Sequence, residues 1–224
     1  MKSLAEIGIL ESLSDEDMRQ LEARCKWRPY RRGQTVFEAG SPSKEVFFIV
    51  EGRVNVISTS SSGKEVVFAS FGPGDTFGEL AAVDGHPRSA SIVAAEPTLL
   101  AVLDAQHFLT LLECHAKVTV KVLQNLTRMV RMGDIRIIEF STLGAAQRVY
   151  AELLRMAMPD AAVAGQWVVR PLPPLRQIAS RVATTRETVA RAMAQIYAAD
   201  LVRRKGRNLY LMDRAKLEEL TKCT

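Results

Sequence analysis

Six short runs of β-forming residues between positions 35 and 103 constrain the fold of this chain more than any other feature. Glycines and one proline separate the runs, which cover residues 35–37, 46–50, 54–57, 66–68, 91–93 and 99–103. The separating residues are Gly40, Gly52, Gly63, Gly72, Pro73 and Gly74. Many short strands with turn residues between them are typical of an antiparallel sandwich or barrel. We therefore predict a β domain that ends near Leu103.

A long helical pattern follows the β domain. Residues 115–140 contain no proline and a single glycine. One apolar stripe has alternating spacings of three and four, and it consists of Leu123, Leu126, Val130, Gly133, Ile137 and Phe140. A second stripe lies on a neighbouring face and consists of Val118, Val122, Met129 and Met132. Two apolar faces predict a helix that packs on its own domain and on a second copy of the chain, through residues 118–140. The alternative is a helix buried within a larger monomer, for which little chain remains.

The positive charge of the chain is concentrated in its last third. Residues 145–224 hold 14 of the 30 Lys and Arg residues and 7 of the 25 Asp and Glu residues, whereas residues 1–144 have a small negative net charge. A compact basic module joined to a nearly neutral one suits nucleic-acid binding. The alternative is a solvated basic surface.

Residues 175–193 have the pattern of a helix, a tight turn and a second helix. Small residues at Ala179 and Ala183 allow the close helix crossing of a helix-turn-helix, and Thr184 or Thr185 can cap the second helix. The next residues offer an exposed face of Arg186, Glu187 and Arg191. In a major groove, arginine donates to guanine O6 and N7, and a carboxylate accepts from cytosine N4. A solvated Arg–Glu pair is the alternative.

A basic run lies between two short apolar runs after the helix-turn-helix, so we predict the tip of a β-hairpin there. It supplies Arg203, Lys205 and Arg207. Cations at a hairpin tip beside a recognition helix are suited to contacts with phosphate.

The loop of residues 77–90 combines a glycine, a carboxylate, an arginine and a hydroxyl. Gly78 permits a close approach of backbone to a ligand. Glu79 is an acceptor suited to a sugar hydroxyl, and Arg88 offers a planar fork of donors to phosphate oxygens. Together they suggest a nucleotide site, and the alternative is a surface turn with an incidental ion pair.

In its order of domains the chain resembles the bacterial cyclic-AMP receptor protein / fumarate-nitrate regulator family of transcription factors. The resemblance is carried by Phe77-Gly78-Glu79-Leu80-Ala81 with Pro87-Arg88-Ser89-Ala90, and by Arg186-Glu187-Thr188-Val189 with Arg191. It implies an α+β fold with three parts. Residues 1–113 would form a jelly-roll-like β-roll that binds a cyclic nucleotide, 114–140 a long dimerisation helix, and 141–224 a winged helix-turn-helix domain.

The same resemblance assigns roles to individual residues. Gly78 and Ser89 would contact the cyclic phosphate, Arg88 would pair with it, and Glu79 would hold the ribose 2′-hydroxyl, with Leu80 and Ala81 completing the site. The DNA contacts would come from Thr185, Arg186, Glu187, Arg191, Arg203, Lys205 and Arg207. The implied partners are a palindromic double-stranded DNA operator, a second copy of the chain and RNA polymerase.

The base of the nucleotide stays open between cyclic AMP and cyclic GMP. The family places Thr-Ser on the long helix to hold adenine, and the corresponding positions here are Gly133 and Asp134. Gly133 has no side chain for the base. Asp134 would accept from the N1–H and N2–H2 donors of guanine, unless it is solvated or paired with Arg131 or Arg136.

Other classes of protein are disfavoured by residue type. The cysteines, Cys25, Cys114 and Cys223, lie far apart without a CxxC spacing, so we expect no zinc or iron–sulfur site. Three histidines at 86, 107 and 115 form no obvious haem or metal cluster, which disfavours a cupin-like metal enzyme. No apolar run approaches the ~20 residues that cross a bilayer, and no secretory signal is present, so we expect a cytoplasmic protein. A regulator of the same fold that is ligand-independent, or that senses another signal, is the remaining alternative.

Overall fold

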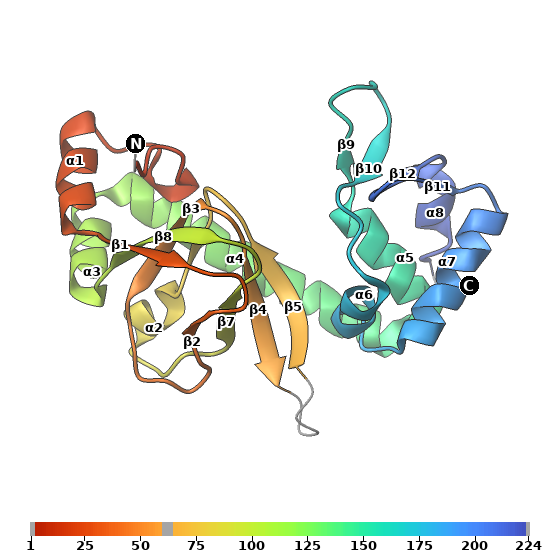
Figure 1. Ribbon diagram of the computed structural model, residues 1–224, viewed down its shortest axis with the longest axis horizontal. Coiled ribbons are helices and arrows are strands. Elements are labelled where there is room, and N and C mark those ends of the chain that lie inside the picture. The colour runs from red at the N-terminus through yellow and green to blue at the C-terminus, as the bar shows by residue number, and fades with distance from the viewer. Residues whose placement is uncertain (1–2, 60–64, 223–224) are drawn as a thin grey trace. The chain divides into compact units, whose positions relative to one another are not determined.

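A computed structural model describes residues 3–59 and 65–222, and Figure 1 shows its elements. Two compact units divide the chain, an N-terminal unit (Met1–Val130) and a C-terminal unit (Arg131–Thr224). The division falls inside the long helix α4 (Ala116–Thr142), so each unit includes part of that helix. Gly63 and Cys223 lie outside the described residues.

Two four-stranded antiparallel sheets form the β domain of the N-terminal unit. One sheet has the order β1 (Lys26–Tyr30), β8 (Thr98–Leu103), β3 (Val46–Glu51) and β6 (Thr76–Phe77). The other has the order β2 (Thr35–Phe37), β7 (Ser91–Ala94), β4 (Val54–Thr59) and β5 (Glu65–Phe71). The predicted antiparallel β domain ending near Leu103 is therefore confirmed.

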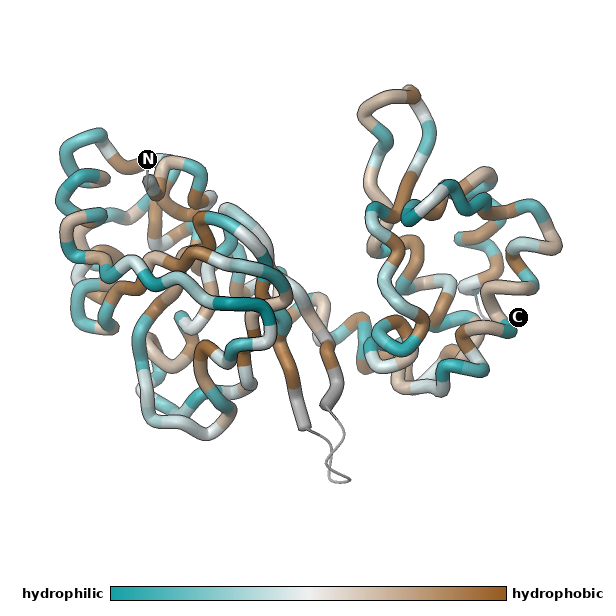
Figure 2. Tube along the Cα trace, in the orientation of Figure 1, coloured by the Kyte–Doolittle hydropathy of each residue, from teal (hydrophilic) through white to brown (hydrophobic). Residues whose placement is uncertain are grey.

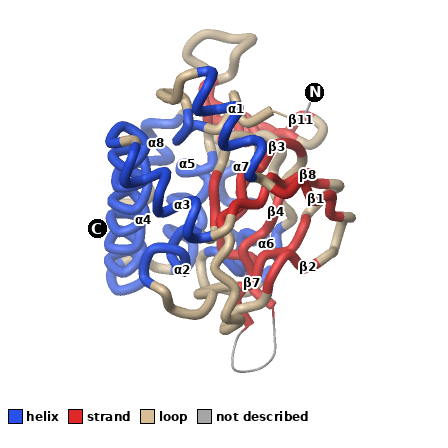
Figure 3. Tube along the Cα trace, turned by 90° about the vertical axis from the view of Figure 1, so that its left-hand side faces the viewer, coloured by secondary structure: helices blue, strands red, loops and turns tan. Residues whose placement is uncertain are grey.

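Strand β3 is buried on both of its faces. Phe47 and Ile49 belong to the core between the two sheets, whereas Val46 and Phe48 belong to a second core that includes residues of the surrounding helices. Because side chains alternate along a strand, a strand covered on both faces has a continuous apolar sequence. Figure 3 shows α3 (Ala105–Cys114) and α4 on one side of the strands of the β domain.

The short helices of the N-terminal unit begin where capping residues satisfy their first N–H groups. Ser14 Oγ accepts from the Asp17 N–H at the start of α1 (Asp15–Arg24), whose tube is largely hydrophilic in Figure 2. Asp104 accepts from the His107 N–H at the start of α3 (Ala105–Cys114). The remaining helices of the unit are the 3-10 helix η1 (Gly8–Leu10) and α2 (Glu79–Asp84).

Helix α4 has one face in the core of the N-terminal unit and another in solvent. Val118 and Val122 are the first two residues of the second apolar stripe. Both are buried in the core that Val46 and Phe48 of β3 share with the surrounding helices. The first stripe is largely uncovered in the single chain, since Leu123, Val130 and Ile137 are 56%, 64% and 66% exposed. An exposed apolar surface of this kind is typical of an interaction site. Dimerisation through this stripe stays a prediction.

The C-terminal unit is a winged helix-turn-helix domain. Its helices are α5 (Ala145–Met156), α6 (Leu175–Arg181), α7 (Arg186–Ala198) and α8 (Arg214–Glu219). A sheet of order β11 (Val202–Lys205), β12 (Asn208–Leu211), β10 (Trp167–Val169) and β9 (Met158–Pro159) completes it. Ala183 has φ 48° in the turn between α6 and α7, and Thr185 Oγ1 accepts from the Thr188 N–H as the cap of α7. The predicted helix-turn-helix and β-hairpin are confirmed.

A buried carboxylate joins three helices within the C-terminal unit. Glu152 on α5 is 2% exposed and contacts three guanidinium groups. Its oxygens lie 3.5 Å from Arg136 Nη2 of α4 and 3.3 Å from Arg181 Nη1 of α6, and it also pairs with Arg155. Arg155 binds Glu139 of α4 as well. These pairs fasten the last part of α4 to α5 and α6.

We expect the substitution Glu152→Gln to lower the free energy of unfolding of the C-terminal unit by about 3–5 kcal/mol, because it removes the charge of a buried carboxylate that pairs with three partly buried guanidinium groups. A Trp27→Phe background leaves Trp167 as the single tryptophan, so urea unfolding followed by its fluorescence reports on this unit.

The matched control is Glu218→Gln, which breaks the exposed Arg214–Glu218 pair in the same unit. We expect it to cost only about 0.3–0.5 kcal/mol. Equal effects of the two substitutions would show that the buried cluster contributes no more than a surface pair.

Candidate functional site

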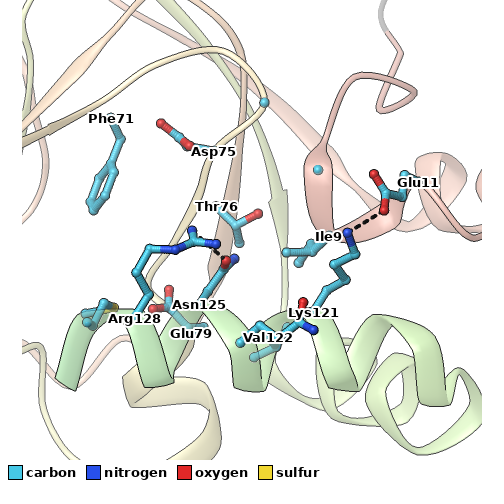
Figure 4. A pocket seen from close by; sticks show the side chains of 14 residues that line it. Ile9, Glu11, Phe71, Asp75, Thr76, Glu79, Lys121, Val122, Asn125 and Arg128 are labelled. Carbon is cyan, nitrogen blue, oxygen red and sulfur yellow. Dashed lines mark hydrogen bonds and ion pairs between the residues drawn. The ribbon is translucent and has the colours of Figure 1, made fainter. Parts of the chain in front are cut away.

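A cavity of about 440 Å³ lies in the N-terminal unit between the β domain and α4. Figure 4 shows side chains from several elements around it. The β domain contributes Phe71, Asp75, Thr76 and Glu79; the N-terminal segment contributes Ile9 and Glu11; and α4 contributes Lys121, Gln124, Asn125 and Arg128. Of the residues predicted to bind a ligand, Glu79 is the one that lines this cavity.

Gly78 fixes where Glu79 lies. It has φ 86°, a left-handed conformation that glycine adopts without strain, and it immediately precedes α2. A Cβ at this position would lie 2.8 Å from Arg88 Nη1 and 2.9 Å from the Glu45 carbonyl oxygen. The close approach predicted at Gly78 is therefore present, and in this structure the approaching groups belong to the protein itself.

The Glu79 carboxylate borders the cavity with one oxygen unsatisfied. Its Oε2 atom is buried and has no hydrogen-bond partner within the described part of the chain, and the same holds for Thr76 Oγ1. Burial raises the pKa of the Glu79 carboxyl, and the opposing effects of its own backbone N–H and of Arg88 are smaller. Buried polar atoms are nearly always satisfied by protein, water or ligand. The unpartnered Glu79 oxygen is thus a place where a bound donor would be stabilised.

Arg88 is buried under the same loop and faces the β domain. Its side chain lies over the ring of Phe37 at 4.1 Å from the centroid, and the residue is 4% exposed. The guanidinium donates to the carbonyl oxygens of Gly78 at 2.9 Å and Glu45 at 2.7 Å, and to Ser43 Oγ at 3.0 Å. Burial lowers the pKa of this guanidinium, with partial compensation from Glu45 and Glu79.

The other residues of the predicted ligand site surround this loop without lining the cavity. Ala81 is buried, whereas Leu80 and Ser89 are exposed. A phosphate contact by Arg88 or Ser89 stays a prediction.

Helix α4 supplies cavity residues that the sequence reasoning missed. Lys121 pairs with Glu11 of the N-terminal segment, and Arg128 Nη1 donates to Asn125 Oδ1 at 3.3 Å. Positions 121, 125 and 128 share one helix face because they are spaced by four and three, and this polar stripe beside the second apolar stripe is the signal that could have found them. Gly133 and Asp134, the predicted base contacts, are exposed and are not among the lining residues.

The predicted DNA-binding residues all lie in the C-terminal unit. Thr185 caps α7, and Arg186, Glu187 and Arg191 are exposed on that helix. The pKa of the Glu187 carboxyl is lowered by its own backbone N–H and by the Thr185 hydroxyl, so its negative charge is stabilised at the helix start. The exposed cations of the β11–β12 hairpin are Arg203, Lys205 and Arg207. The arrangement joins a helix that exposes two arginines and a glutamate to a basic hairpin.

Across residues 3–59 and 65–222, no group of three or more His, Cys, Asp and Glu side chains is placed to hold a metal ion. Within the same ranges, no helix is both long enough and apolar enough to cross a membrane.

Two protein-family models match separate parts of the chain. Residues 27–115 match the cyclic nucleotide-binding domain, and residues 147–220 match the Crp-like helix-turn-helix domain. The first match covers the β domain and α3, and the second covers most of the C-terminal unit.

Curated relatives and solved structures share this organisation. The cyclic AMP receptor protein of Thermus thermophilus is 28% identical over 214 residues, which are 95% of each protein. A CRP-like cAMP-activated global transcriptional regulator of Mycobacterium tuberculosis is 26% identical over 96% of each. A CooA mutant from Carboxydothermus hydrogenoformans has the same fold, with a TM-score of 0.81 at 20% identity over 99% of this chain and 96% of that one. With its cyclic nucleotide-binding domain, long helix and Crp-like helix-turn-helix, the chain belongs to the cyclic-AMP receptor protein / fumarate-nitrate regulator family of DNA-binding transcription regulators.

Proposed function

We propose that this regulator responds to a 3′,5′-cyclic nucleotide, cyclic AMP or cyclic GMP, bound in the cavity beside α4. The observation that carries the proposal is the buried, unpartnered Glu79 oxygen at the cavity surface. An ionised carboxylate only accepts hydrogen bonds, so the ligand must offer a donor there. The ribose 2′-hydroxyl of a cyclic nucleotide is such a donor.

The cyclic phosphate is proposed to bind the loop that follows Glu79, with Gly78, Arg88 and Ser89 as its contacts and Leu80 and Ala81 beside them. The three hydrogen bonds of Arg88 use three of the five N–H groups of its guanidinium. The remaining N–H groups, and any that leave the backbone carbonyls, are then available to a phosphate oxygen.

The proposed output is a palindromic DNA operator bound by a homodimer. Exposed apolar residues on α4, among them Leu123, Val130 and Ile137, would form the dimer interface. Two copies would place their α7 helices in successive major grooves, about 34 Å apart, with Arg186, Glu187 and Arg191 toward the bases. RNA polymerase is the further partner expected of a regulator at a promoter, and a DNA target implies a cytoplasmic location.

Regulators of this fold differ in what they sense. The name of the Mycobacterium tuberculosis relative describes it as cAMP-activated, whereas a Xanthomonas campestris protein of the same fold, 18% identical with a TM-score of 0.68, is described as responsive to c-di-GMP. A ligand-independent regulator, or one with another effector, is therefore the second candidate. Titration with nucleotides decides between them.

We expect isothermal titration calorimetry of the full chain to detect cyclic AMP or cyclic GMP, and Glu79→Gln to weaken the bound nucleotide roughly 10- to 100-fold. The reason is the loss of a hydrogen bond to a charged acceptor, worth about 1.5–3 kcal/mol. The 2′-deoxy analogue should bind the wild type and the variant alike, since it lacks the hydroxyl.

The control for this titration is Glu113→Gln, an exposed carboxylate of the same unit that does not line the cavity. It should leave the affinity unchanged. A wild type that binds no cyclic nucleotide would sink the proposed effector.

For the DNA interface, we expect Arg186→Ala and Lys205→Ala to impair DNA binding in different ways. Arg186→Ala should lose about 1–3 kcal/mol of discrimination at one base pair of each half-site, because arginine donates to base edges. Lys205→Ala should weaken all sequences uniformly and reduce the salt slope by about one, because it contacts phosphate. Fluorescence anisotropy with two-half-site duplexes over a range of salt concentrations measures both effects. If Arg186→Ala lowered the affinity for every sequence equally, α7 would not be the base-contacting helix.

A further inference from the structure

The side of the cavity formed by α4 presents hydrogen-bond donors. Asn125 and Arg128 lie one turn apart, and Figure 4 shows both beside Glu79. Arg128 Nη1 donates to Asn125 Oδ1 at 3.3 Å, which occupies the carbonyl oxygen of that amide and turns its NH2 group toward other partners. Four further N–H groups of Arg128 remain for a ligand.

Arg128 is also the cation of this cavity that has no carboxylate partner within the described residues. Lys121, the other cation in the lining, is paired with Glu11. No ion pair of Arg128 is present in the described part of the chain, and its side chain is exposed in the single chain. The Arg128 guanidinium, bonded to a neighbouring amide, thus lines the cavity with most of its N–H donors left for a ligand.

The two purines differ in what they offer to such a fork. The edge of guanine that carries O6 and N7 has two acceptors, whereas the corresponding edge of adenine has the N7 acceptor and the N6–H2 donor. Arginine binds guanine O6 and N7 with two parallel hydrogen bonds, and it opposes the amino group of adenine donor to donor. A base bound against α4 is therefore favoured when it is guanine.

An aromatic ring borders the same space from the β domain. Phe71 lines the cavity, and its ring is parallel to that of Phe77, with centroids 6.3 Å apart and an interplanar angle of 3°. Aromatic side chains stack on nucleobases of any identity, so Phe71 provides a surface for the base without selecting it. Selection is left to the polar residues of α4.

From these contacts we infer that Arg128, positioned by Asn125, is a specificity-determining residue, and that the effector is a guanine cyclic mononucleotide whose O6 and N7 accept from the Arg128 fork. The inference rests on the proposed function, because it takes the cavity to be the nucleotide site. It is separate from the predicted role of Asp134, which would address the N1–H and N2–H2 edge of guanine.

A phosphate is the competing ligand for Arg128, since a guanidinium fork also binds phosphate oxygens. Cyclic AMP and cyclic GMP carry the same phosphate. An Arg128 that holds phosphate would support both nucleotides equally, whereas an Arg128 that contacts the base would support one of them.

The test is calorimetric titration of the full chain with cyclic GMP, cyclic AMP and 7-deaza-cyclic GMP, which lacks the N7 acceptor. We expect the wild type to prefer cyclic GMP. Arg128→Gln should weaken cyclic GMP roughly tenfold to hundredfold and reverse the preference, because glutamine pairs with adenine N6 and N7. The 7-deaza analogue should bind the wild type less well than cyclic GMP, and that difference should vanish in Arg128→Gln.

The matched control is Arg131→Gln, the same change on the same helix at a position that does not line the cavity. It should leave the ratio of the two affinities unchanged. Arg128→Lys, which keeps the charge and removes the fork, is the second variant and should also lose the preference for cyclic GMP.

The outcomes separate this inference from the proposed function. Equal weakening of both nucleotides by Arg128→Gln, or an unchanged ratio, would overturn the role of Arg128 in base recognition while nucleotide binding stands. A wild type that binds cyclic AMP more tightly than cyclic GMP would overturn the guanine assignment. A wild type that binds neither nucleotide would overturn both proposals.

Discussion

The buried guanidinium of Arg88 holds together the loop on which the ligand site depends. It joins residues 78 and 88 of that loop to residues 43 and 45, which lie before and at the edge of strand β3. Three hydrogen bonds and the ring of Phe37 offset the free-energy cost of burying the guanidinium charge. Because Arg88 occupies the space beside Gly78, only glycine fits there, and α2 must begin at Glu79. The position of the cavity carboxylate thus follows from packing around one arginine.

The charged and polar groups of the cavity come from three parts of the N-terminal unit. Arg88 is engaged within the β domain and does not line the cavity, whereas the β domain, the N-terminal segment and α4 all contribute lining residues. A ligand bound there would bridge the loop and the helix that continues into the C-terminal unit. Any difference in its affinity between two conformations of α4 would shift the population of DNA-binding states by the same free energy. In the C-terminal unit, the buried Glu152 cluster fastens the last part of α4 to α5 and α6.

Local patterns in the sequence were sufficient for most of the fold, and long-range contacts explain where they were not. The strands of residues 46–50 and 99–103, a cap at Thr184 or Thr185, and the helix-turn-helix were all predicted. Strand β1 was missed because Pro29 and alternating charges disguise it; it lies at a sheet edge, where proline is tolerated. Two of the three hydrogen-bond partners of Arg88 are backbone carbonyls, that of Glu45, which is 43 residues away, and that of Gly78 in its own loop, and backbone groups leave no sequence signal. The cavity residues 121–128 of α4 were not predicted, because the resemblance to the family places the base contacts at Gly133 and Asp134.

A crystal structure of the full chain with cyclic GMP shows most directly where a cyclic nucleotide binds and which atoms it meets. We predict the ribose 2′-hydroxyl within hydrogen-bond distance of a Glu79 carboxylate oxygen, with guanine O6 and N7 facing the Arg128 guanidinium. A nucleotide whose ribose lies away from Glu79, or a cavity left empty while the nucleotide occupies another site, would contradict this prediction.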